Sequence, residues 1–185
     1  MPKLQDVGMM STADREIVAS RLFHASRELV FRMWTDREHI SNWWGPRGFT
    51  TTTYEMDVRP GGVWRFVMHG PDGRDYHNKI VYVQLAEPER LLYKHVPQPG
   101  LEPVNCEVMV TFEEEGGDTR LTSRMIFPTA AQRYHIAKTY GAIEGLHQTL
   151  ARLDEEVSKM AVAGSARQEF VISREFNATR ELSKE

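Results

Sequence analysis

Apolar residues recur every three or four positions over residues 130–160, close to the end of the chain. This spacing places them along one face of a long α-helix, with charged residues on the opposite face. Because several strand patterns and no comparably long helical pattern precede it, we expect this helix to lie across one curved sheet. Its apolar stripe consists of Ile136, Tyr140, Ile143, Leu146, Leu150, Leu153 and Val157.

Alternation of apolar and polar residues predicts about seven strands upstream of that helix. Gly- and Pro-rich turns separate most of them, for example GPDG at 70–73, and short turns between consecutive strands imply an antiparallel sheet. The predicted strands span residues 16–23, 50–58, 63–69, 76–86, 91–96, 104–113 and 119–127.

Two short helices are expected between the first and second strands. Ser26 can cap a helix over 27–34, and Thr35 with Glu38 forms a capping-box pattern for a second helix. That helix must end near Trp43 because Gly45 and a proline follow directly. The pattern as a whole predicts an α+β domain whose antiparallel sheet packs against the long C-terminal helix.

Composition restricts the classes of function. The chain has 185 residues, an apolar fraction of 41% and a formal net charge of -3. It therefore lacks the excess of positive charge that is typical of proteins that bind nucleic acid or an anionic membrane. Cys106 is the single cysteine, which excludes an internal disulfide and agrees with a reducing compartment. With no signal-peptide pattern and no membrane-length apolar run, we expect a soluble cytoplasmic protein.

The chain contains a partial internal repeat. EIVASRLFHASREL at 16–29 and EFVISREFNATREL at 169–182 share nine of fourteen residues. We therefore divide the chain into a leader over 1–14, a domain over 15–160, a linker over 161–168 and a partial second copy over 169–185. That copy would contain a strand and a helix start, and it could be disordered, pair with a sheet edge or swap into a homodimer.

Six motifs lie along the chain: FHASRELVF at 23–31, WTD at 34–36, WWGP at 43–46, DVRPGGVWRF at 57–66, PERL at 88–91 and EGLHQTLARL at 144–153. Together they resemble the SRPBCC, or START-like, superfamily that includes the Bet v allergens, and more narrowly the family of activator-of-heat-shock-protein-90-ATPase homologue C-terminal-like proteins. The resemblance covers about residues 15–159 and is specific for the family, not for an activity. The chain has no recognisable co-chaperone N-terminal domain, so the chaperone role is not carried over.

The resemblance implies a helix-grip fold, in which the sheet wraps around the C-terminal helix and leaves a cavity between them. The strand alternation agrees, because it gathers aromatic and methionine side chains into one adaptable apolar wall. Gly141 and Gly145, one turn apart, serve either close packing or space for a ligand. The candidate ligand-binding residues are Trp44, Phe49, Tyr54, Met56, Trp64, Phe66, Met68, His77, Tyr93, His95, Val108, Val110, Met125, Tyr140, Glu144 and His147.

Three functions remain open at this stage. The leading hypothesis is binding of a small hydrophobic or aromatic molecule. The second is a cyclase- or hydrolase-type enzyme using His77, His95, Glu144 or His147 as acid and base, although no catalytic motif is present and no catalytic residue is assigned. The third is a co-chaperone-like adaptor for other proteins. The histidines and aspartates at 69–77 match no standard zinc spacing, so no metal or cofactor is expected.

Overall fold

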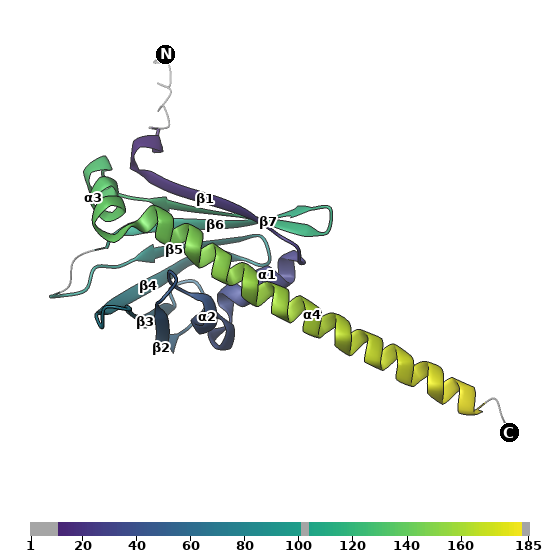
Figure 1. The fold of residues 1–185 in the computed structure, drawn as a ribbon. Coiled ribbons are helices and arrows are strands. Elements are labelled where there is room, and N and C mark those ends of the chain that lie inside the picture. Colours follow the sequence, from purple (N-terminus) through teal and green to yellow (C-terminus); the bar gives the residue numbers. More distant parts are fainter. Residues whose placement is uncertain (1–10, 101–103, 183–185) are drawn as a thin grey trace, which may run out of the picture.

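The computed structural model describes residues 11–100 and 104–182, with side chains through residue 165. One sheet is covered on one face by helices, and the last helix crosses that face and extends beyond it (Figure 1). The elements in chain order are η1 (Ala13–Arg15), β1 (Glu16–Phe23), α1 (Arg27–Thr35), α2 (Arg37–Trp43), β2 (Thr50–Met56), β3 (Val63–His69), β4 (Asp75–Ala86), β5 (Arg90–His95), β6 (Cys106–Glu115), β7 (Asp118–Ile126), α3 (Ala130–Tyr140) and α4 (Ala142–Leu182).

The seven strands form one antiparallel sheet in the order β1-β7-β6-β5-β4-β3-β2. The predicted α+β class, the two short helices after the first strand and the long C-terminal helix are confirmed. Strands β2 to β7 are neighbours in chain order, whereas β1 pairs with the last strand, Glu16 opposite Ile126. Helices α1 and α2 therefore carry the chain from one edge of the sheet to the other.

The hydrophobic core lies between the inner face of the sheet and helices α1, α2 and α4. Leu150, Leu153 and Val157 of α4 are at most 1% exposed. In contrast, Tyr140 and Ile143 of the predicted apolar stripe are each 42% exposed. Residues 150–157 of α4 therefore close the core, whereas the junction of α3 and α4 packs less closely on the sheet.

The expected single helix over 130–160 is broken. Gly141 has the left-handed backbone angles φ 58° and ψ 37°, so α3 ends there and α4 begins one residue later. Glycine adopts this conformation at little cost because it has no Cβ, and helices commonly end on such a residue. The sequence analysis had assigned Gly141 to packing or ligand space, whereas the structure uses it as a helix terminus.

Helix α4 also continues through Leu182. The linker expected over 161–168 and the strand expected at the start of 169–185 are therefore helical in the backbone, which is a correction to both predictions. The segment AVAGSARQ at 161–168 contains several good helix formers and no proline, so nothing in it stops a helix. The similarity between residues 16–29 and 169–182 is therefore confined to the sequence. Most of the expected leader, residues 1–10, and the last residues, 183–185, lie outside the described residues.

The second short helix begins one residue later than its capping-box pattern suggests. Asp36, not Thr35, is the N-cap, because its Oδ1 accepts a hydrogen bond from the backbone N–H of Glu38 at 2.8 Å. Thr35 belongs to the last turn of α1, where its hydroxyl donates to the carbonyl of Phe31. Across the described part of the chain, no helix has the length and apolar character that a membrane crossing needs.

Candidate functional site

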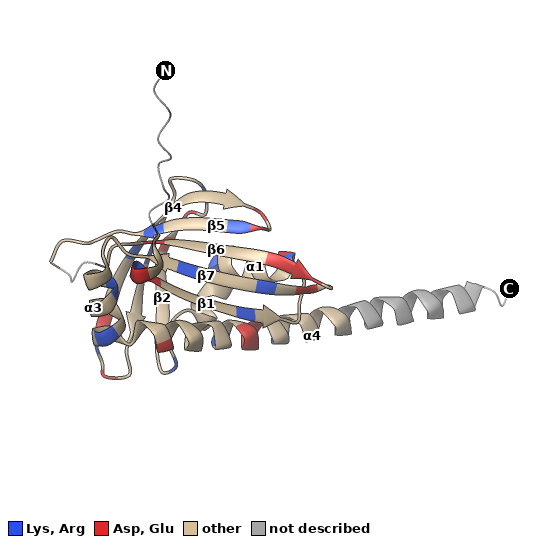
Figure 2. Ribbon diagram, turned by 90° about the horizontal axis from the view of Figure 1, so that it is seen from above, with Lys and Arg blue, Asp and Glu red and all other residues tan. Residues whose placement is uncertain are grey.

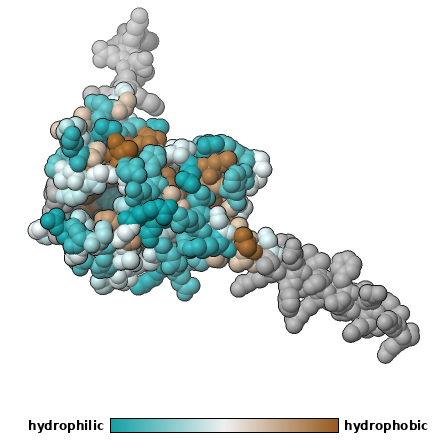
Figure 3. Space-filling model, in the orientation of Figure 1, coloured by the Kyte–Doolittle hydropathy of each residue, from teal (hydrophilic) through white to brown (hydrophobic). Residues whose placement is uncertain are grey.

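A cavity of about 200 Å³ lies between the inner face of the sheet and the first turns of α4. Figure 3 shows a hollow in the surface on the side of the domain where α3 lies, opposite the projecting end of α4. The walls come from α1, the loop before β2, five strands and the α3–α4 junction. They consist of Trp34, Trp44, Gly45, Pro46, Phe66, Met68, Asn78, Tyr93, His95, Val108, Ser123, Met125, Tyr140, Ala142, Gly145, Leu146 and Thr149.

Half of the residues proposed from the sequence lie on this wall. They come from five different elements and from the loop after α2, so the fold brings together positions spread over almost a hundred residues of sequence. They are Trp44, Phe66, Met68, Tyr93, His95, Val108, Met125 and Tyr140.

Several proposed residues are close to the cavity but not on its wall. Trp64 and Val110 are at most 1% exposed and belong to the filled core. Met56 is half-buried and packs on that core. Phe49 is turned toward Tyr76, with ring centroids 5.8 Å apart.

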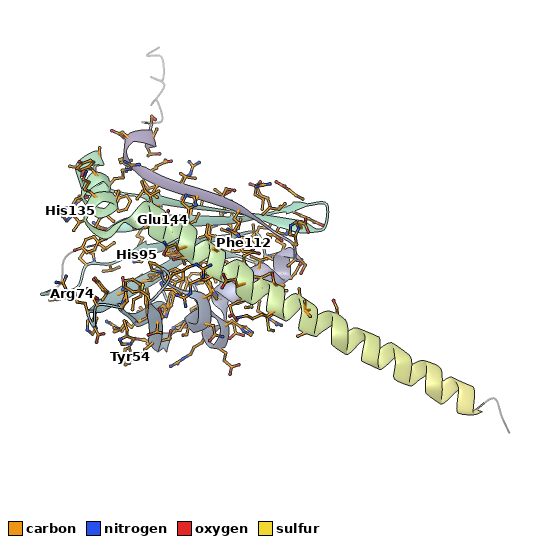
Figure 4. All side chains as sticks on the ribbon, in the orientation of Figure 1. Tyr54, Arg74, His95, Phe112, His135 and Glu144 are labelled. Carbon is orange, nitrogen blue, oxygen red and sulfur yellow. The ribbon has the colours of Figure 1, made fainter. Side chains whose placement is uncertain are left out.

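Tyr54 and His77 were placed on the wrong side of the sheet. Tyr54 is 64% exposed because the pairing of β2 with β3 is irregular between Thr53 and Glu55, and the extra residue interrupts the alternation. Figure 4 shows it at the margin of the domain, away from His95. His77 is exposed because the inner face of β4 carries the next residue, Asn78.

Glu144 and His147 are exposed on α4 and do not reach the cavity. The Glu144 carboxylate accepts a hydrogen bond from the Gln148 amide at 3.1 Å. Leu146 and Thr149 of the same helix face inward instead. The helix periodicity explains this result, since positions one or two residues away from an inward residue point elsewhere.

Sequence reasoning missed Asn78 and Ser123 on the sheet, and Trp34 on α1. Asn78 could have been found, because it alternates with the buried Ile80 and Tyr82 on the same strand. The position of Trp34 depends on how α1 packs on the sheet, which no local pattern reveals.

The loop between α2 and β2 closes one side of the cavity, and Arg152 of α4 holds it in place. Arg152 Nη1 donates to the carbonyls of Gly45, Pro46 and Phe49 at 2.9 to 3.1 Å, and Nη2 donates to that of Asn42. Burial, followed by the neighbouring Arg47, lowers the pKa of Arg152. The guanidinium thus stabilises a loop that has no regular structure of its own.

Trp44 forms the aromatic part of the wall. Its ring contacts those of Trp34, Trp43, Trp64 and Phe66, with centroids 4.8 to 5.8 Å apart. All four tryptophans of the chain therefore belong to one cluster, which fixes the position of the Trp44 ring.

Gly145 lies beside this loop. A Cβ atom at position 145 would lie 3.3 Å from Pro46 Cγ, which is tighter than ordinary van der Waals contact. Gly145 also lies on the cavity wall, next to Leu146. The absence of a side chain at this position thus lets α4 approach the loop closely at the margin of the cavity.

The sheet side of the cavity carries polar groups among its apolar residues. The Asn78 Nδ2 donates to the carbonyl of Tyr76, while its Oδ1 has no partner among the described residues. Within the described residues, the side chains of Tyr93, His95 and Ser123 have no hydrogen-bond partner. Burial lowers the pKa of His95 to about 4 and raises that of Tyr93 well above its ordinary value, so both are neutral at pH 7.

Charged side chains lie elsewhere. None of the residues on the cavity wall is Asp, Glu, Lys or Arg. The acidic residues at the β6–β7 hairpin, red in Figure 2, lie at the end of the sheet away from α3. Among the described side chains, no carboxylate pairs with His95, and no three His, Cys, Asp or Glu residues are placed to hold a metal ion.

The sequence profile of the activator of Hsp90 ATPase homolog 1-like proteins matches residues 24–158, which is most of the chain. The chain belongs to this family. The SRPBCC resemblance of the six motifs is thereby confirmed, as is the helix-grip architecture that the family implies. Among curated proteins, none matches the chain significantly.

Solved structures agree on the fold of this family. A protein from Nitrosomonas europaea has a TM-score of 0.72 at 22% identity, covering 81% of this chain and 98% of its own. One from Arthrobacter aurescens has a TM-score of 0.74 at 22% identity, covering 80% and 89%. A Silicibacter pomeroyi protein named for the same family has a TM-score of 0.63 at 20% identity, covering 78% and 99%. At these identities the likeness establishes the fold alone.

Proposed function

We propose that the protein binds one small hydrophobic or aromatic molecule in the cavity between its sheet and α4. The observation that carries this proposal is a cavity of about 200 Å³ with a mainly apolar wall. Native interiors are close-packed and contain few voids larger than a water molecule. A mainly apolar hollow of this size that reaches the surface therefore favours an apolar occupant.

The volume indicates the size of that occupant. An apolar cavity of about 150 Å³ stays dry and accommodates a benzene molecule, so about 200 Å³ suits a molecule with one or two rings. Trp44, Phe66 and Met68 line one side, and Val108 and Met125 line another. Aromatic rings offer flat contact surfaces, while methionine side chains adapt to irregular shapes.

The geometry gives less support to the other two functions. An acid–base mechanism with Glu144 and His147 requires both side chains in the cavity, yet both are exposed. An adaptor with a filled core would not need a cavity of about 200 Å³ beside α4. Ligand binding accounts for the cavity and for the hydrogen bonds by which Arg152 holds the loop at the side of the cavity.

Native mass spectrometry of the purified protein, followed by organic extraction, tests the proposal. We expect a bound apolar molecule at one per chain, or, after removal of any such molecule, one-to-one binding of an added aromatic hydrocarbon such as naphthalene. The spectrum also reports the oligomeric state. A protein that is empty as isolated and binds no aromatic probe would contradict the proposal.

A further inference from the structure

The cavity has a polar corner, which consists of Asn78 on β4 and of Tyr93 and His95 on β5. Ile80 lies opposite His95 in the β4–β5 pairing. Asn78 is two residues from Ile80, so Asn78 and His95 are diagonal neighbours on one face of the sheet, within reach of a single ligand group. Tyr93 precedes His95 by two residues on the same face.

These groups are ready to bind a ligand because the protein itself does not use them. Tyr93 is 3% exposed, and no hydrogen bond to its hydroxyl exists within the described residues. The Asn78 Oδ1 is also free, because only the amide nitrogen is engaged. Buried polar groups are generally hydrogen-bonded, and leaving one without a partner is unfavourable. The polar atoms of the corner are not among the fully enclosed ones, so a ligand group in the cavity can hydrogen-bond to them in place of water.

The charge state of the polar corner and of the cavity wall determines which class of ligand can bind. His95 is neutral because burial lowers its pKa to about 4, and the cavity wall has no lysine or arginine to balance an anion. It has no carboxylate to balance a cation either. Moving an ion from water into such a site without a counter-charge is strongly unfavourable. Neutral imidazole, phenol and amide groups together both donate and accept hydrogen bonds. They can therefore pair with a ligand hydroxyl, which does both, or donate to a ligand carbonyl, which only accepts.

We infer that the ligand is an uncharged molecule with a ring-containing apolar body and a hydroxyl or carbonyl group that hydrogen-bonds to Asn78, Tyr93 and His95. This inference rests on the proposed function, since it specifies the class of ligand for the same cavity. The apolar body lies against Trp44, Phe66 and Leu146, and ionised analogues of the same shape are excluded.

Calorimetric titration of the purified protein at pH 7 with naphthalene, 2-naphthol and 2-naphthoate tests the inference. The three probes share one ring system and differ in having no polar group, a neutral hydroxyl or a carboxylate. We expect 2-naphthol to bind about tenfold more tightly than naphthalene, as one good hydrogen bond allows. We expect 2-naphthoate not to bind in the millimolar range.

Two variants and one control locate the effect. Asn78→Leu and His95→Phe should each reduce the preference for 2-naphthol over naphthalene, measured within each variant as the ratio of the two dissociation constants. His24→Phe is the control, because His24 is 81% exposed and bonds Asp118 at the other end of the domain. A thermal melt of each variant verifies folding, and the naphthalene titration provides an internal check of the cavity.

The outcomes separate the two proposals. If none of the probes binds, the proposed function itself fails. If naphthalene and 2-naphthol bind wild type equally well, the cavity binds apolar molecules but the polar corner does not recognise a ligand, and the inference is overturned. Tighter binding of 2-naphthoate than of 2-naphthol would overturn the exclusion of charge.

Discussion

Arg152 of α4 donates a hydrogen bond from Nη1 to the backbone carbonyl of Pro46 at 3.1 Å, and so links the helix to the loop that closes the cavity. The same nitrogen also reaches the carbonyls of Gly45 and Phe49. One side chain thus replaces the regular hydrogen bonding that the loop lacks. Since these residues lie around Trp44, the position of the aromatic wall depends on Arg152.

Replacing Arg152 by methionine should therefore loosen the loop. The variant keeps the apolar stem but leaves several carbonyl groups without their charged donor, which should lower the free energy of unfolding by about 2 kcal/mol. Urea denaturation followed by tryptophan fluorescence measures this change. Arg47→Met is the matched control, because Arg47 forms an exposed ion pair with Glu155, and such pairs contribute less than about 1 kcal/mol. Equal losses in the two variants would contradict the role given to Arg152.

His95 should make stability depend on pH. Its folded-state pKa is about 4 against an ordinary value of 6.5, so between these values the unfolded chain binds more protons than the folded one. The free energy of unfolding therefore falls as the pH is lowered from about 6.5 to 4, and the full loss is present below pH 4. A shift of this size corresponds to about 3 kcal/mol as an upper bound.

The measurement is urea denaturation of wild type and of His95→Phe between pH 4 and pH 7. The carboxylates titrate in both proteins, so the difference between them isolates the histidine. We expect the variant to gain stability relative to wild type as the pH falls. Parallel pH profiles for the two proteins would show that His95 is as readily protonated in the folded state as in the unfolded one.

Tyr82 offers a test of an unsatisfied polar group. Its hydroxyl oxygen is buried and has no hydrogen-bond partner among the residues that the structure describes, and burial raises its pKa. Tyr82→Phe removes the desolvated hydroxyl and keeps the ring contact with Tyr93, so the free energy of unfolding should rise by about 1 kcal/mol. Thermal and urea denaturation measure the gain, and Tyr54→Phe should have no effect because Tyr54 is 64% exposed. A loss of stability in Tyr82→Phe would mean that the hydroxyl has a partner.

The sequence was sufficient to predict the order of the elements, because period-two and 3.6-residue patterns are local signals that tertiary packing reinforces here. It was less reliable for the site, where a shift of one residue reverses the direction of a side chain. The irregular pairing at Thr53 and Glu55 moved Tyr54 outward. On β4 the alternation was assigned with His77 inward, whereas Asn78 holds that position.

Other differences arise from single-residue conformations and from packing between distant elements. The helix break depends on the positive φ of Gly141, which looks the same in sequence as the helical Gly145. Trp34 joins the cavity wall only because α1 packs against the sheet and Trp44. The carbonyls that Arg152 binds lie more than a hundred residues earlier in the chain.

The central claim is that the space beside Gly145 is a ligand site, and Gly145→Leu tests it most directly. The new side chain must enter the space between α4, Pro46 and the cavity, because a Cβ alone would approach Pro46 Cγ to 3.3 Å. The substitution should also stabilise the helix, since glycine in a helix interior is about 1 kcal/mol less favourable than alanine. Gly164→Leu adds the same bulk to the same helix where a Cβ meets no atom within 4 Å, and it is the matched control.

Calorimetric titration of naphthalene into wild type and the two leucine variants, each verified as folded by thermal melting, is the decisive measurement. We predict one-to-one binding to wild type and to Gly164→Leu with the same dissociation constant, and a loss of at least tenfold in affinity for Gly145→Leu. A folded Gly145→Leu protein that binds naphthalene as tightly as wild type would place the ligand somewhere other than the cavity between the sheet and α4.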